Sequence, residues 1–209
     1  MLSRSLQVRW VLANLASSAI GFGVFAVLAH GLASPHDEEH PSPAQFAAHA
    51  FGLLPAGAII ALGQRLVLGR HRKMARWFVP ATSLTMTAAF LIGAYGLRPP
   101  FDFLLSYAVI GAAVELASRR VERDGLREAV RRAAVTGLLF ATGSFIGMLA
   151  LSLLAKVLGI RLGEMGEDVV HHVITMTLGG LFIGAATGLL SARRIAKRVL
   201  PIGPTTLGE

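Results

Sequence analysis

The chain has 209 residues, of which 54% are hydrophobic and 15% are charged, with a net charge of +8 and a mean hydropathy of +0.61. Because a soluble domain usually has about a quarter of its residues charged, this composition excludes an ordinary soluble domain. The absence of cysteine excludes disulfides, thiol nucleophiles and cysteine-ligated metals.

Six apolar stretches follow one another along the chain. A helix needs about 20 mostly apolar residues to cross the roughly 30 Å hydrocarbon core of a bilayer, and the stretches approach or reach that length. We therefore predict an all-α, six-span transmembrane helical bundle that forms a single integral membrane domain over residues 1–209. The predicted spans are 8–29, 46–68, 78–97, 101–117, 135–158 and 170–190.

The basic residues lie on one side of the predicted membrane. Of the 20 Lys and Arg residues, 17 lie at the N-terminus, in two alternate loops or at the C-terminus, whereas Arg98, Lys156 and Arg161 lie on the other side. This positive-inside pattern predicts that both the N- and the C-terminus are cytoplasmic. It also places the basic residues against anionic lipid headgroups. They flank apolar spans and form no aromatic-interleaved basic patch of the kind that binds nucleic acid, so we expect no nucleic-acid partner.

The spans pair into three helical hairpins with common features. The odd spans each begin after a basic residue and run to an Ile-Gly pair, and the even spans each contain a Gly-Ala pair with a polar residue seven positions after the glycine. These glycines and polar residues are Gly57 and Gln64, Gly111 and Ser118, and Gly184 and Ser191. We predict three repeated hairpins related by an axis along the membrane normal. The alternative is that helices entering from a basic interface look alike without being repeats.

The connection between the second and third spans carries a family resemblance. Residues 63–70 read Gly-Gln-Arg-Leu-Val-Leu-Gly-Arg, and Arg76-Trp77 opens the third span. This connection resembles a group of uncharacterised bacterial multi-pass membrane proteins, in which a Gly-rich helix ends in Gln-x-x-Val-Leu-x-Arg and an Arg-Trp helix follows. The chain departs from the group at Ser118 and Arg132, where a second Trp or Gln is frequent. The resemblance implies a multi-pass protein of the bacterial cytoplasmic (inner) membrane and implies no activity.

Glycines at four-residue spacing lie on one face of the last two spans. They are Gly143 and Gly147 in the fifth span, and Gly180, Gly184 and Gly188 in the sixth. Small residues at this spacing let membrane helices approach closely. We predict that these glycines pack helices within the fold, and the alternative is a contact surface for a partner subunit or a second copy of the chain.

Histidines and acidic residues gather on the predicted outer side. His36 and His40 flank acidic residues in the first outer loop, and His171 and His172 follow an acidic loop before the sixth span. Imidazole and carboxylate groups suit zinc, nickel, copper or cobalt. The four histidines are weak candidate metal ligands, because their spacing matches no fixed ligand motif, and we favour a solvated acidic loop as the explanation. The sequence therefore assigns no metal and no cofactor.

Charges within the spans are few. Glu115 lies four residues before Arg119, in the order that favours an ion pair on one helix, so we predict a pair near the cytoplasmic interface. Lys156 lies at the outer end of the fifth span, where its ammonium group reaches the headgroups. The segment Thr142-Gly143-Ser144-Phe145 lacks the spacing of an intramembrane serine protease, and no other catalytic motif is present. We therefore expect no enzyme.

Two functions agree with this pattern. The first is a small transporter or channel-like permease, whose outer loops form a vestibule. The second is a non-catalytic accessory or assembly subunit that docks on a larger membrane complex through the glycines of the sixth span. The outer histidines favour the first, and the scarcity of deep charges favours the second.

Overall fold

The computed structural model describes residues 2–32, 43–69, 76–92, 101–116, 125–158 and 169–199. Within these ranges the chain forms six helices and no strand, which confirms the predicted all-α bundle. The helices are α1 (Leu2–Leu32), α2 (Pro43–Leu68), α3 (Phe78–Ile92), α4 (Phe101–Leu116), α6 (Leu126–Leu158) and α7 (Val169–Val199).

Four of the described helices are long and apolar enough to cross a membrane, namely α1, α2, α6 and α7. The other two are shorter, since α3 has 15 residues and α4 has 16. At about 1.5 Å per residue they extend about 22–24 Å, less than the roughly 30 Å of a bilayer core. The third span was predicted to reach residue 97, but residues 93–100 lie outside the described part of the chain.

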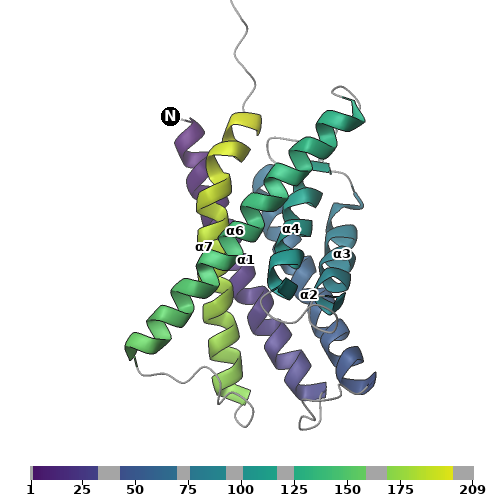
Figure 1. Cartoon of the computed structure of the whole chain (residues 1–209), viewed down its shortest axis with the longest axis vertical. Helices are drawn as coiled ribbons and strands as arrows, with labels where there is room; N and C mark the ends of the chain where they lie inside the picture. The colour runs from purple at the N-terminus through teal and green to yellow at the C-terminus, as the bar shows by residue number, and fades with distance from the viewer. Residues whose placement is uncertain are drawn as a thin grey trace, which may run out of the picture.

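The helices pack in the order of the chain, and the last returns to the first. Each of α1, α2, α3, α4 and α6 contacts the next helix, and α7 contacts α1, so the bundle is a closed ring. The N-terminal end of α1 and the C-terminal end of α7 lie at the same end of the bundle, whereas α6 crosses the bundle obliquely (Figure 1). We call the end that carries Arg4, Arg193 and Arg194 the basic end.

The side chains of α1 also reach helices that are not its neighbours in the ring. Trp10 lies 6.4 Å from Phe140 of α6, Phe22 lies 6.3 Å from Tyr107 of α4 and Phe25 lies 5.9 Å from Phe90 of α3, measured between ring centroids. These six rings belong to the buried core of the bundle. Together with its contacts to α2 and α7, these rings bring α1 against every other described helix, and its residues Asn14, Ser17 and Ser18 are buried.

The glycines of α7 determine how closely α1 approaches. A Cβ atom on Gly180 would overlap the backbone of Ser18, and one on Gly184 would overlap the backbone of Asn14. At Gly188 an added Cβ would lie 2.9 Å from the Cα atom of Val11. The glycine face of α7 is therefore covered by α1 of the same chain.

The glycines of α6 make the equivalent contact with α7. A Cβ on Gly143 would lie 2.5 Å from the Cα of Thr187, and one on Gly147 would lie 2.5 Å from the Cα of Ile183. Only glycine permits these backbones to pack so closely.

Candidate functional site

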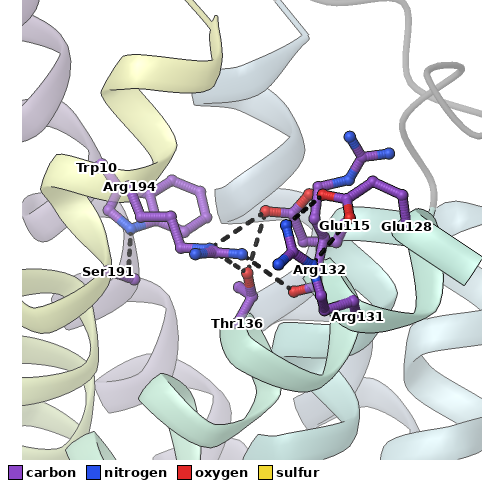
Figure 2. Close-up of polar contacts among 8 residues, drawn as sticks. All are labelled: Trp10, Glu115, Glu128, Arg131, Arg132, Thr136, Ser191 and Arg194. Carbon is purple, nitrogen blue, oxygen red and sulfur yellow. Dashed lines mark hydrogen bonds and ion pairs between the residues drawn. The ribbon is translucent and has the colours of Figure 1, made fainter. Parts of the chain in front are cut away.

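A charged cluster lies near the basic end and joins α4, α6 and α7 (Figure 2). The Nε atom of Arg194 donates a hydrogen bond of 2.9 Å to Thr136 Oγ1 and lies 3.8 Å from Glu115 Oε1. Thr136 in turn donates a 3.0 Å hydrogen bond to the same carboxylate oxygen, and Arg194 Nη2 donates one of 3.4 Å to the carbonyl oxygen of Arg132. Figure 2 shows the guanidinium group of Arg194 pointing from α7 toward this carboxylate.

The carboxylate of Glu115 is almost fully enclosed. Its side chain is 5% exposed and that of Arg194 is 23% exposed. A buried carboxylate needs both an opposite charge and hydrogen-bond donors, and the charged cluster supplies them from two other helices. Gly111, one turn before Glu115, permits this geometry because a Cβ there would lie 2.7 Å from the carbonyl oxygen of Thr136.

A second polar cluster joins α1, α2 and α7, and its side chains are neutral. Gln64 Nε2 donates a 3.0 Å hydrogen bond to Asn14 Oδ1, and Asn14 Nδ2 donates one of 2.9 Å to the carbonyl oxygen of Trp10. Trp10 Nε1 donates a 2.8 Å bond to Ser191 Oγ, which donates one of 2.7 Å to the carbonyl oxygen of Thr187. We call Trp10, Asn14, Gln64 and Ser191 the amide cluster, and all four are buried.

Three buried polar residues of α1 form a row. Trp10, Asn14 and Ser18 are four residues apart and therefore lie on one face of the helix, about 6 Å apart along its axis. Each contacts a different helix, because Trp10 bonds to α7, Asn14 bonds to α2 and Ser18 accepts a 3.2 Å hydrogen bond from Tyr107 of α4. The row leads from the middle of α1 toward the basic end.

Several buried oxygen atoms near this row have no hydrogen-bond partner within the described residues. They are Gln64 Oε1, Ser17 Oγ and Thr187 Oγ1. An unpaired polar atom in a protein interior costs about 1–3 kcal/mol, and lipid supplies no partner. The bundle therefore retains hydrogen-bonding capacity that its own described side chains leave unused.

His171 and His172 lie away from both clusters, at the opposite end of α7 from Ser191 and Arg194. His171 and His172 lie in the first turn of α7, where His171 has a buried Nε2 atom without a partner in the described structure. His36 and His40 lie outside the described residues. In the ranges that the structure describes, no three His, Cys, Asp or Glu side chains are grouped so that they could hold a metal ion. The metal site stays a sequence prediction.

No protein family, no curated protein and no solved structure matches the chain. Its function has to be inferred from its own residues.

Sequence reasoning missed most of this site. It paired Glu115 with Arg119, which lies outside the described residues, whereas the carboxylate lies beside Arg194, 79 positions further along the chain. Asn14 was not singled out, although an amide in an apolar span signals a contact between helices. Gln64 was noted as a repeat position, and its partner on α1 was not foreseen.

Proposed function

We propose that this chain is a six-span permease of the bacterial cytoplasmic membrane, with a pathway for small solutes along the polar face of α1. The row of Trp10, Asn14 and Ser18 carries the proposal, because it lines the inside of the bundle with hydrogen-bonding groups that face other helices. Polar groups inside a membrane protein are costly and commonly mark a solute path.

The two ends of the row support a pathway that is closed in this conformation. On the side away from the basic end, the buried rings of Phe22, Phe25 and Phe90 fill the space between helices. At the basic end, the charged cluster of Glu115, Thr136 and Arg194 ties three helices together. Opening would require the rings to separate on one side and the ion pair to separate on the other.

The glycine contacts support the proposed repeat of three hairpins. Gly57 of α2 lies against Ser83 of α3, Gly111 of α4 lies against α6, and Gly184 of α7 lies against α1. Each repeat glycine thus packs an even helix on the first helix of the next hairpin, and the third returns to the first. A pseudo-threefold ring of hairpins has this property.

The alternative role, an accessory subunit of a larger complex, was suggested by the glycines of α7 as a docking surface, and that surface is not exposed. Gly180, Gly184 and Gly188 are covered by α1 of the same chain. A subunit would need a different surface.

The absence of cysteine permits a direct test of the pathway. The single variants Ser17→Cys and Ser18→Cys place a thiol next to the row and within it, respectively. Ile20→Cys is the control, because Ile20 is 57% exposed on the outside of the bundle. In membranes, we expect a small water-soluble thiosulfonate to modify the first two at least about 10-fold faster than the control, because the thiolate forms only in contact with water. Protection of all three thiols in correctly folded protein would overturn the pathway.

A further inference from the structure

We infer that Asn14, Ser17 and Gln64 form a binding site for a small neutral solute that carries amide or hydroxyl groups. This inference rests on the proposed permease and names its substrate class. We call the three residues the amide site.

The amide site lies where α1 meets α2. Gln64 is fully buried and uses its amide nitrogen to hold Asn14, which leaves its Oε1 atom without a donor among the described residues. Ser17 packs against Gly63, the residue before Gln64, because a Cβ added at Gly63 would come within 2.8 Å of Ser17 Oγ. Ser17 is only 6% exposed, and its hydroxyl group has no hydrogen-bond partner within the described structure.

The unused atoms define what the ligand has to offer. The carbonyl oxygen of Gln64 requires an N–H or O–H donor, and the hydroxyl of Ser17 both donates and accepts. Asn14 fixes the orientation of the glutamine amide, since its own Nδ2 is engaged by the carbonyl oxygen of Trp10. A small ligand that carries both a donor and an acceptor, such as a primary amide or a polyol, has the groups that these two atoms require.

The surroundings exclude an ion as the ligand. Asn14, Ser17, Gln64, Trp10 and Ser191 are all uncharged, and the nearby charged cluster pairs its own Arg and Glu. A buried ion without a counter-charge carries a large desolvation cost. A metal cation such as calcium would need about six to eight oxygen ligands, and the amide site leaves two oxygen atoms unused.

The depth of the amide site agrees with a solute in transit. Asn14 and Ser17 lie within the apolar stretch 8–29, and Ser18 is its midpoint. The Tyr107–Ser18 contact lies on one side of Asn14 along α1, and the Trp10–Ser191 contact lies on the other. A solute between these contacts has protein hydrogen bonds in place of the water it has left.

The test measures the unfolding temperature of the purified protein in detergent in the presence of acetamide or glycerol. Acetate and methylammonium, which are charged molecules of similar size, serve as controls. We expect acetamide or glycerol to raise the unfolding temperature by about 2–4 °C at saturation, because a ligand that binds the folded state stabilises it. The charged molecules should give no rise. Gln64→Leu should abolish the shift, and Ser17→Ala should raise the half-saturating concentration about 3–10-fold.

Gln45→Leu is the matched control, because Gln45 is also a buried glutamine of α2 but lies at the other end of the helix. It should keep the full shift. Equal shifts in the Gln64→Leu variant, stabilisation by the charged molecules, or no shift with acetamide and glycerol would each overturn the amide site. Thiol modification of Ser18→Cys without any acetamide or glycerol shift would leave the permease standing and remove the amide site alone.

Discussion

At the scale of single residues, the ion pair of Glu115 and Arg194 is the most consequential contact in the bundle. It is held by a threonine that accepts from one partner and donates to the other. Removing one partner of such a pair leaves a buried charge without compensation, whereas removing both does not. The pair is therefore open to a test in which the double variant is more stable than either single variant.

Glu115→Gln or Arg194→Gln alone should lower the stability of the protein by about 2 kcal/mol, less than the cost for a fully buried pair because Arg194 is partly exposed. This corresponds to a fall of about 4–8 °C in unfolding temperature. The double variant should recover part of that loss. Thermal unfolding in detergent measures all three.

Glu128→Gln is the control, since the Glu128–Arg131 pair has the same chemistry on the exposed first turn of α6. Its unfolding temperature should remain close to that of the parent protein. Additive losses in the double variant would show that Glu115 and Arg194 do not act as a pair.

The residue scale is also where the sequence was least informative. The spacing of Glu115 and Arg119 indicated a pair within one helix, and helical periodicity contains no information on Arg194, which reaches Glu115 from another helix. Partners on different helices follow from tertiary packing, which no local pattern encodes. The same reason explains why Gln64 was noticed and its bond to Asn14 was not.

At the scale of helices, each described helix overlaps one predicted span, and some helices extend beyond it. Hydropathy placed the fifth span at 135–158 and the sixth at 170–190, whereas α6 begins at Leu126 and α7 extends to Val199. The added turns carry Arg127, Arg193 and Arg194, which a hydropathy criterion rejects although arginine is a good helix former. Arg194, the centre of the charged cluster, lies in such an added turn.

The contact between α1 and α7 depends on glycine at defined positions. Gly184→Ala should destabilise the protein by about 1–3 kcal/mol, because the new Cβ would overlap the backbone of Asn14 and neither helix can yield locally. Gly179→Ala on the same helix is the control, since its Cβ would meet Leu151 at an ordinary 3.5 Å. Unfolding temperature and elution as a single species measure the difference. Equal stability of the two variants would contradict the close packing of α1 on α7.

At the scale of the whole molecule, the described helices form a ring that α7 closes on α1. The repeated Gly-Ala pairs predict three equivalent hairpins, and that repeat stays a prediction. Closure brings Trp10 and Ser191 together although 181 positions separate them. Such a contact depends on the global arrangement of the helices, which no local sequence pattern specifies.

The direction of the bundle in the membrane follows from the charge at its ends. The basic end carries arginines at the start of α1 and the end of α7, so it should face the cytoplasm. Trp77→Cys places a thiol just before α3, and Val170→Cys places one at the start of α7, at the opposite end of the bundle. Both parent residues are exposed, Trp77 to 51% and Val170 to 62%. In intact cells, an impermeant maleimide should label Val170→Cys at once and Trp77→Cys only after the membrane is permeabilised. Labelling of Trp77→Cys in sealed cells would reverse the topology, and the charged cluster would then lie at the outer mouth of the pathway.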